Sequence, residues 1–470
     1  MPTRPNVEEQ ASRQEIRRER SSWRWLAIAM IVGLVLRVGL LDKQSLNMDE
    51  VFELNISDQS WTTIIHRPNS FPPLFSMVLK SVRQATGGLL AGRWVSVGMG
   101  VATIGLVYLL AKEWYGRRTG VIAAILVAVS PLYVYYSQLG RAYAMYAAAT
   151  VLTMWLFERA CKRQHQRDWV FFAISSVFGM YVHYYFVVLL TLLLTLAVTE
   201  RRLKSLWQLV LPSVLIVVVC LPLAFLLYGD FVFQRDLRKP VPFGLAAFGY
   251  TYFSVFSGYS LGPSRGELHQ LSAKQAVLQT LPWLVLLAMA CLALTLQPIK
   301  RWGRVDAILR VFLLGIAPVL LIGLVSRWQG LTYNTRHLFW VGLPCLIFLA
   351  HLIASLRKGD WFRWAAVAVL AGLACVGIFN RHFISRYMNE DLQATARLID
   401  QSGSSAFVSP GYMAKALKYL CDDPDKVVPA TVDVVSRETL AECLTGVSPI
   451  LESRSPFLFV YGRPFHGDPE

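Results

Sequence analysis

The chain has few charged residues and no cysteine pattern typical of a metal or redox site. Of its 470 residues, 16% are Asp, Glu, Lys or Arg, whereas soluble domains carry roughly 25%. Its 7 cysteines form no CxxC motif and no Cys/His spacing of the kind that binds zinc. No internal repeat or low-complexity segment stands out. These features exclude an ordinary soluble domain and argue against a zinc-binding protein or a repeat array.

What the chain has instead is apolar sequence. Hydrophobic residues make up 55% of it and the mean hydropathy is +0.44, values typical of a membrane protein. The net charge of +16 comes mostly from Lys and Arg in short loops between apolar runs, as in the cytoplasmic loops of multi-span proteins. We therefore expect membrane lipids and no nucleic acid as partners. No cleavable signal peptide is evident, so residues 1–24 are expected to be a basic cytoplasmic N-terminus.

The apolar runs predict an all-α polytopic membrane protein. A bilayer core needs roughly 20 apolar residues per helix, and on that basis we expect about eleven transmembrane helices between residues 25 and 379. The expected spans are 25–41, 93–110, 121–136, 142–157, 169–182, 184–198, 206–228, 276–296, 307–325, 338–356 and 362–379. With the N-terminus inside, the basic loops between them all fall on the cytoplasmic face.

The outer face is expected to carry two larger polar parts. The first outer loop, 42–92, contains the double proline Pro72-Pro73, which suits the first turn of a helix lying on the membrane. We expect amphipathic helices there. The tail, 380–470, alternates helix-like and strand-like stretches and predicts a small α/β extracytoplasmic domain. In an oxidising compartment Cys421 and Cys443 would pair as a disulfide, the alternative being two free thiols.

Unexpected polar residues gather at the outer ends of the spans. They are Asp49, Glu50, Arg93, Gln138, Arg141, His183, Tyr184, Tyr185, Asn334, Arg336 and His337. Ionisable groups in a membrane are costly and usually functional, although an acidic pair at a helix start also stabilises the helix N-terminus. Arginine matches phosphate oxygens, and a carboxylate can act as base toward a hydroxyl. The pattern favours transfer of a group from a lipid phosphate to a hydroxyl.

Six motifs in order carry a resemblance to a known family. They are "MDE" after the first span, "FPPLF", "GRWVSVGMGVATIGLVYLLAKEWYG", "SPLYVYYSQLGRAYAMYAA", "YVHYYF" and "YNTRHLFWVGLP". Over most of residues 20–345 the chain resembles the GT-C membrane glycosyltransferases. It is most similar to the bacterial branch containing protein O-mannosyltransferases, the aminoarabinose transferase of lipid A and similar LPS-modifying sugar transferases.

The resemblance implies roles for the polar residues. Asp49 matches the family's acidic residue of the first outer loop and is expected to be the catalytic base, or a ligand of a divalent cation (Mg or Mn). Glu50 has either a direct catalytic role or that of a solvated neighbour. Arg141 and Arg336 match arginines expected to bind the donor phosphate, with a snorkelling or ion-paired role as the alternative.

Other matches are weaker. Arg93 also matches a family arginine and is a candidate for phosphate binding, although an interfacial anchor is the stronger interpretation. Candidates for substrate contact, against a packing role, are His183, Tyr184, Tyr185, Gln138 and His337. Phe71 stands where the family often has His before the double proline, and His66, five residues upstream, is the candidate to serve instead.

The resemblance implies an enzyme of the bacterial inner membrane with its C-terminus outside. We expect it to move a hexose or pentose from a polyprenyl-phosphate donor to a hydroxyl of lipid A or LPS, a cell-surface glycan or a protein, by a single inverting displacement. A flippase or transporter of lipid-linked sugars is the alternative from another class, although such a protein would place its charges near the midplane. An O-antigen ligase or polymerase is a further alternative, kept open by the loop 229–274.

Overall fold

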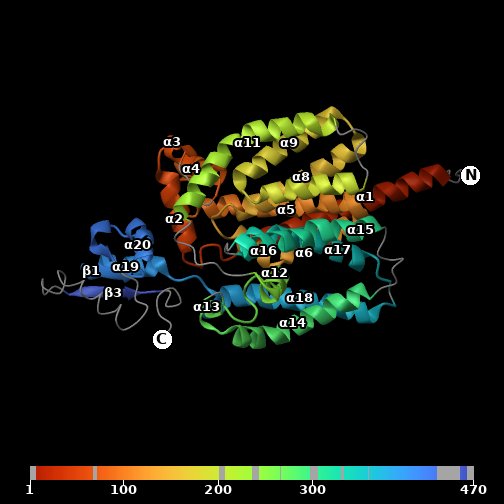
Figure 1. Cartoon of the computed structure of the whole chain (residues 1–470). Coiled ribbons are helices and arrows are strands. Elements are labelled where there is room, and N and C mark those ends of the chain that lie inside the picture. The colour runs from red at the N-terminus through yellow and green to blue at the C-terminus, as the bar shows by residue number, and fades with distance from the viewer. Residues whose placement is uncertain are drawn as a thin grey trace, which may run out of the picture.

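The computed structural model of the chain describes residues 7–66, 71–200, 207–234, 243–264, 266–296, 305–329, 333–357, 359–430 and 456–462. Most of them form a bundle of helices, with a smaller α/β unit at one end (Figure 1). The first half contains α1 (Val7–Val38), α2 (Met48–Asp58), α3 (Trp61–His66), α4 (Leu74–Thr86), α5 (Ala91–Tyr115), α6 (Arg117–Val129), α7 (Pro131–Ser137), α8 (Tyr143–Arg163), α9 (Gln166–Val182), α10 (Phe186–Thr199) and α11 (Trp207–Gln234).

The second half adds the remaining bundle helices and three short turns. They are α12 (Leu245–Ser257), α13 (Glu267–Gln270), α14 (Ala273–Thr295), α15 (Val305–Val311), the π-helical turn η3 (Phe312–Ile316), α16 (Ala317–Gln329), the 3-10 turns η4 (Thr335–His337) and η5 (Phe339–Val341), α17 (Gly342–Ala354) and α18 (Trp361–Phe383). Helices α5, α6 and α8 pack together at the centre of the bundle. Every predicted span coincides with one or more of these helices.

The helices form a multi-pass membrane protein. By length and composition, six of the described helices can cross a membrane, or up to seven if α6 and α7 count as one broken span. Two shorter apolar stretches, Phe186–Thr199 and Phe339–Ala354, come in addition. The polytopic helical class is therefore confirmed, while the count of about eleven spans stays a prediction.

A sharp bend between α6 and α7 shapes the outer end of the bundle. The two helices differ in direction by 61°, because Ser130 precedes Pro131 and takes an extended conformation. Arg37 of α1 is fully buried beside this bend and donates hydrogen bonds to Ser137 Oγ at 3.0 Å and to the carbonyl of Ala128 at 3.0 Å. The bend thus turns the chain back toward the first outer loop, where the segment 138–142 follows α7.

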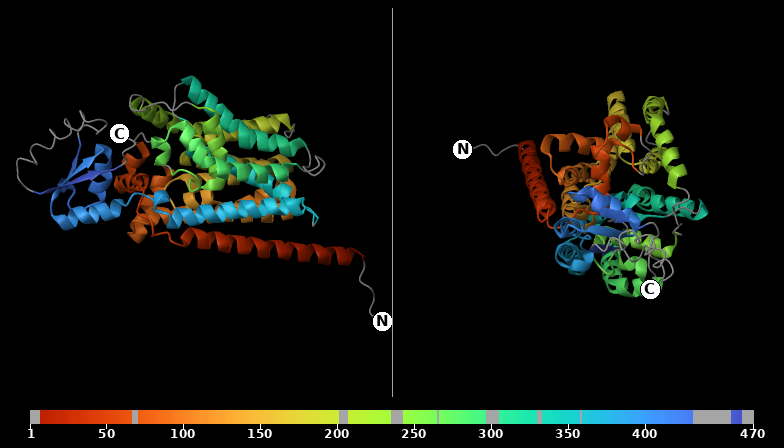
Figure 2. Two further views of the ribbon diagram at one scale, coloured as in Figure 1. Left: turned by 90° about the horizontal axis from the view of Figure 1, so that it is seen from below. Right: turned by 90° about the vertical axis from the view of Figure 1, so that its left-hand side faces the viewer.

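The loop 42–92, which we expect to be the first outer loop, forms the short helices α2, α3 and α4 in its described residues, as predicted. They lie at the same end of the bundle as the α/β unit, opposite the N-terminus (Figures 1 and 2). Helix α2 begins with a capping box, in which the side chain of Asn47 accepts from the backbone of α2 and the Glu50 carboxylate accepts from the Asn47 N–H. Helix α4 begins directly after Pro73.

The C-terminal unit confirms the predicted α/β appendage. It contains α19 (Leu392–Ser402), β1 (Ser405–Ser409), α20 (Ala414–Leu420), β2 (Val427–Pro429) and β3 (Phe457–Tyr461), with the short turns η6 (Ser385–Tyr387), η7 (Gly411–Met413) and η8 (Pro424–Lys426). The strands form a parallel sheet in the order β2-β1-β3, with Ala406 opposite Val427 and Leu458. Whether this unit lies outside the cytoplasm stays a prediction.

The C-terminal unit is joined to the first outer loop by side-chain contacts. Asp58, at the end of α2, accepts from Tyr419 of α20 at 2.7 Å and pairs with Arg83 of α4 at 2.6 Å. Cys421 is buried and a free thiol, whereas Cys443 lies outside the described residues. The disulfide between the two therefore stays a prediction.

Candidate active site

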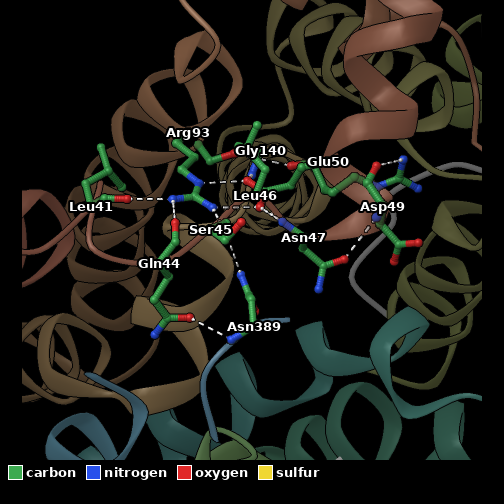
Figure 3. A network of polar contacts seen from close by, with 12 residues as sticks. Leu41, Gln44, Ser45, Leu46, Asn47, Asp49, Glu50, Arg93, Gly140 and Asn389 are labelled. Atoms are coloured by element: carbon green, nitrogen blue, oxygen red, sulfur yellow. Dashed lines mark hydrogen bonds and ion pairs between the residues drawn. The ribbon is translucent and has the colours of Figure 1, made fainter. Parts of the chain in front are cut away.

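Asp49 and Glu50 are adjacent in α2 but face different partners. Neighbouring residues of a helix point in directions about 100° apart, so a single group cannot readily meet both carboxylates. Glu50 turns inward to Arg93 (Figure 3), whereas the Asp49 carboxylate accepts a hydrogen bond from Arg336. The two acids of the "MDE" motif therefore have separate structural roles.

Glu50 and Arg93 form a buried ion pair in which every donor of the guanidinium is used. Their side chains are only 2% and 3% exposed. Arg93 Nε and Nη2 donate to the two oxygens of Glu50, both at 2.9 Å. The remaining donors go to the carbonyls of Leu41 at 2.6 Å, Gln44 at 2.9 Å and Ser45 at 3.0 Å. A guanidinium has five N–H groups, so none is left for a ligand.

This geometry corrects two expectations. Arg93 does not fit the role of a phosphate-binding residue, because all its donors are taken by protein acceptors within the buried network of Figure 3. Glu50 does not fit a direct catalytic role, since its oxygens also accept from the N–H groups of Gly140 at 2.7 Å and Asn47 at 2.8 Å. The pair holds the end of α1, the start of α2 and the turn after α7 together.

Asp49 and Arg336 form the opposite kind of pair. Asp49 Oδ2 and Arg336 Nη1 are 3.3 Å apart, and the two side chains are 35% and 34% exposed. Solvent-accessible ion pairs contribute about 0–1 kcal/mol, so a substrate can separate these groups at little cost. The position of Asp49 in the first turn of α2 adds the positive end of the helix to its surroundings.

Arg141 supports Asp49 from behind. Its Nη1 donates to the backbone carbonyl of Asp49 at 3.1 Å and to Glu53 Oε2 at 2.6 Å, and its guanidinium lies 4.7 Å from the centre of the Phe71 ring. Ser76 also donates a short hydrogen bond to Glu53, which is buried. Glu53 is a site residue that the sequence reasoning missed, although its spacing of four residues from Asp49 places it on the same helix face.

His183 and His337 contact each other. His183 Nε2 lies 3.2 Å from His337 Nδ1, and the ring of His183 stacks on Tyr146 at 4.3 Å. His183 lies in the break between α9 and α10, where burial, together with the guanidinium groups of Arg336 and Arg141, lowers its pKa to about 3. The ring is therefore neutral at physiological pH, and it joins the segment carrying Arg336 to the core.

The other predicted contact residues occupy varied positions. Tyr185 stacks on His337, with ring centres 5.1 Å apart. Tyr184 precedes it in the same break and is partly buried. Gln138 Nε2 lies 3.2 Å from the carbonyls of Arg37 and Gly39, at the end of α1. His66 is exposed on α3, with Nδ1 2.8 Å from the carbonyl of Thr62. Direct substrate contact by these residues stays a prediction.

Two cavities meet at the Asp49–Arg336 pair. The larger, of about 540 Å³, is polar and is lined by Asn47, Asp49, Ser264, Asn334, Arg336, Arg381, Arg386, Asn389 and Glu390, among others. The smaller, of about 290 Å³, is rich in tyrosine. Its lining includes Tyr135, Tyr136, Tyr143, Tyr250, Tyr259 and Tyr333, together with Asp49 and Arg336. The larger volume is within the range of small-molecule sites.

The segment that follows α18 forms one wall of the larger cavity. Arg381 Nη2 donates to Asn389 at 3.0 Å, and Asn389 in turn donates to the carbonyl of Ser45 at 2.9 Å. Arg386 donates to the hydroxyl of Tyr387 at 2.7 Å. These residues come from more than 300 positions away in sequence from Asp49, and the sequence reasoning did not include them.

The chain resembles known proteins in sequence and in fold. A family model described as dolichyl-phosphate-mannose-protein mannosyltransferase matches residues 70–255, a range that contains Arg93, Arg141 and His183. No curated protein sequence matches the chain. ArnT from Cupriavidus metallidurans, solved with undecaprenyl phosphate bound, superposes with a TM-score of 0.55 at 13% identity, over 93% of this chain and 88% of ArnT.

The oligosaccharyltransferase AglB from Archaeoglobus fulgidus gives a similar result. Its structure with an inhibitory peptide and a dolichol-phosphate superposes with a TM-score of 0.53 at 14% identity, over 88% of this chain. This chain spans 64% of the AglB chain. The chain has the same fold as ArnT and AglB. The fold expected from the six sequence motifs is therefore confirmed.

The described residues around Asp49 were expected to bind a divalent cation as one alternative. No group of three or more His, Cys, Asp or Glu side chains that could hold an ion occurs in the part of the chain that the structure describes. The Asp49 carboxylate has the cationic Arg336 at 3.3 Å instead. A divalent cation at Asp49 would therefore take most of its ligands from substrate oxygens.

Proposed function

We propose that the protein is a glycosyltransferase that moves a sugar from a polyprenyl-phosphate donor to a hydroxyl of an acceptor at the extracytoplasmic face of a bacterial inner membrane. The observation that carries the proposal is the weak Asp49–Arg336 ion pair where the two cavities meet. A carboxylate and a guanidinium in this position can act on the two groups that exchange at the anomeric carbon. The carboxylate would meet the acceptor hydroxyl, and the guanidinium would meet the departing phosphate.

The smaller, aromatic cavity suits the donor. Tyrosine rings offer apolar faces to a sugar ring or an isoprenoid chain and hydroxyls to its oxygens. The solved ArnT structure contains undecaprenyl phosphate and the AglB structure a dolichol-phosphate, two polyprenyl phosphates. These two bound lipids favour the same class of donor here. The larger, polar cavity would then receive the acceptor.

In the proposed reaction Asp49 takes the proton of the acceptor hydroxyl. The oxygen attacks the anomeric carbon from the side opposite the phosphate, so that the new C–O bond forms as the bond from carbon to the phosphate oxygen breaks. The electron pair leaves with the polyprenyl phosphate, and Arg336 stabilises the charge that develops there. Arg141 holds the backbone of Asp49 in place. This single displacement inverts the anomeric configuration.

The alternatives receive less support from the described contacts. A transporter of lipid-linked sugars would need its charged groups near the midplane, whereas Asp49, Arg141 and Arg336 converge at the end of the bundle that carries the first outer loop. For an O-antigen ligase, the basic residues Arg235, Arg238 and Lys239 of the loop 229–274 lie outside the described residues. Glu267, in the same loop, caps its own helix by accepting from the Ser264 N–H at 2.6 Å.

Purified protein in liposomes provides the direct test. We expect it to consume undecaprenyl-phosphate sugars, offered one at a time, and to release undecaprenyl phosphate when an extract of surface glycolipids and proteins is present. Mass spectrometry of the extract would identify the product by a shift of one sugar. Translocation of the intact lipid-linked sugar without release of undecaprenyl phosphate would favour the transporter instead.

Arg386 is expected to act on the acceptor side. Arg386→Gln should raise the KM for the acceptor by about 10-fold or more, because hydrogen bonds from a charged group contribute about 1.5–3 kcal/mol, while the KM for the donor changes little. Initial rates at varied concentrations of each substrate would separate the two effects. Arg163→Gln, at the far end of α8, is the matched control. An equal rise in both KM values would place Arg386 outside the acceptor site.

A further inference from the structure

The histidine pair behind the site has a fixed arrangement of protons. His183 Nδ1 accepts the backbone N–H of Tyr185 at 3.1 Å. A ring nitrogen that accepts a hydrogen bond carries no proton, so neutral His183 has its proton on Nε2. That Nε2 faces His337 Nδ1 at 3.2 Å. His183 is therefore the donor, and His337 Nδ1 must be the unprotonated acceptor.

The surroundings hold His183 in this neutral form. Tyr146 of α8 stacks on its ring, and Phe71 meets it edge-on with ring centres 5.1 Å apart. The charged groups that act on it, Arg336 and Arg141, are both cationic. Burial and these cations disfavour a positive charge on His183 over the whole physiological range.

His337, the hydrogen-bond acceptor of the pair, lies on the same turn as Arg336. Arg336 and His337 belong to η4, whose first turn is capped by the side chain of Asn334, which accepts from the Arg336 N–H at 3.1 Å. The ring of His337 also stacks on Tyr185. The hydrogen bond from His183 therefore fixes the side of η4 that faces the core, and Arg336 extends from the same turn to Asp49.

We propose that His183 and His337 are positioning residues: their single permitted hydrogen bond holds η4 so that Arg336 meets the donor phosphate, and a proton on His337 breaks this bond and releases Arg336. The proposal rests on the proposed function, because it assigns Arg336 to the donor phosphate. It makes the pair a built-in acid-sensitive link rather than a direct substrate contact.

The geometry leaves no place for an extra proton. Protonation of His337 Nδ1 would set two N–H groups against each other across the gap of 3.2 Å. His183 could become the acceptor only by moving its proton to Nδ1, which would cost the hydrogen bond from Tyr185. Two N–H donors that face each other in this partly buried contact lose a hydrogen bond and gain a repulsion, so the link opens in acid.

Two substitutions of His337 separate the hydrogen bond from the ring. The amide oxygen of Asn lies close to the position of His Nδ1, accepts a hydrogen bond and is not protonated in this range, whereas Leu offers no acceptor. The probe is undecaprenyl phosphate without sugar, and its binding to the full-length protein in detergent would be measured from about pH 7.5 to about pH 5.5. Thermal unfolding at each pH would show that every sample is folded.

Wild-type protein is expected to bind undecaprenyl phosphate about tenfold more weakly at the acid end, because His⁺ on η4 releases Arg336. His337→Asn should bind with little dependence on pH, and His337→Leu should bind weakly at every pH. The folded chain keeps His183 neutral while the unfolded chain takes up a proton near pH 6.5, so stability itself falls as the pH drops below about 6.5. Binding is therefore compared only at pH values where thermal unfolding begins well above the assay temperature.

The possible results distinguish failure of the proposed histidine pair from failure of the proposed function. Equal pH dependence in wild type and His337→Asn would overturn the role of the pair and leave the proposed function standing. Absence of binding by wild type at every pH would overturn the proposed function and the role of the pair with it. Ring-nitrogen NMR of histidine-labelled protein, assigned with His183→Gln, adds a readout independent of ligand, and a proton on His183 Nδ1 at neutral pH would also overturn the proposal.

Discussion

Asp49→Asn is expected to lower kcat for sugar transfer by about 10²–10⁴-fold, the usual contribution of a general base. The amide has the shape of the carboxylate but cannot take the proton of the acceptor hydroxyl. Asp49 Oδ2 would lose its ion pair with Arg336, and because that pair is a third exposed, the loss should cost the fold about 1 kcal/mol or less. The effect should therefore appear in the rate rather than in the stability.

Release of undecaprenyl phosphate at saturating donor and acceptor measures this prediction. The KM for the donor is expected to change much less than kcat, because Arg336 remains in place to meet the phosphate. Wild-type rates in a folded Asp49→Asn protein would remove Asp49 from the role of base. An equal rise in donor KM with no change in kcat would instead make Asp49 a binding residue.

The same helix supplies a matched control. Asp58 ends α2, and its carboxylate pairs with Arg83 and accepts from Tyr419, on the side of α2 that meets the C-terminal unit. Asp58→Asn makes the same chemical change in the same helix but away from both cavities. It should leave kcat within about threefold of wild type, since surface pairs contribute little. A large loss in this variant would show that the contact with the C-terminal unit, and not Asp49 alone, controls turnover.

Local sequence patterns were sufficient for the helices and for part of the site. The apolar runs located the helices of the bundle because a segment that crosses a bilayer must be apolar and helical. The polar residues at the ends of the spans pointed to Asp49, Arg141 and Arg336, which do converge. The same reasoning could have included Glu53, which is four residues after Asp49. Its apolar neighbours Phe52 and Leu54 gave no sign that it belongs to the site.

The wall of the larger cavity was not predictable in this way. Arg381 and Arg386 come to line the same cavity as Asp49 through the packing of α18 and the segment after it, and no local spacing relates them to α2. For Arg93, position in the sequence does not distinguish two roles. An arginine at the end of a span can be a phosphate ligand or a buried anchor. Only the list of its acceptors, three carbonyls and one carboxylate, distinguishes the two.

Glu50→Gln is expected to destabilise the protein by about 3–5 kcal/mol, because it removes one partner of a buried ion pair. One amide oxygen can still accept from Gly140, but the NH₂ group must then face donors from Arg93 and Asn47. Thermal unfolding in detergent should show a lower Tm than for Asp49→Asn, the same carboxylate-to-amide change one residue earlier. Equal Tm values for the two variants would contradict the buried network.

Removal of both partners sharpens this prediction. In many proteins two apolar residues can replace a buried ion pair at little cost, because the desolvation penalty disappears with the charges. Here Glu50→Leu combined with Arg93→Leu should remain as unstable as either single variant. The carbonyls of Leu41, Gln44 and Ser45 would lose their donors, and a buried carbonyl without a partner costs about 1–3 kcal/mol. Recovery of the Tm in the double variant would contradict this expectation. It would mean that the hydrogen bonds from Arg93 to these three carbonyls contribute little to holding α2 and Asp49 in place.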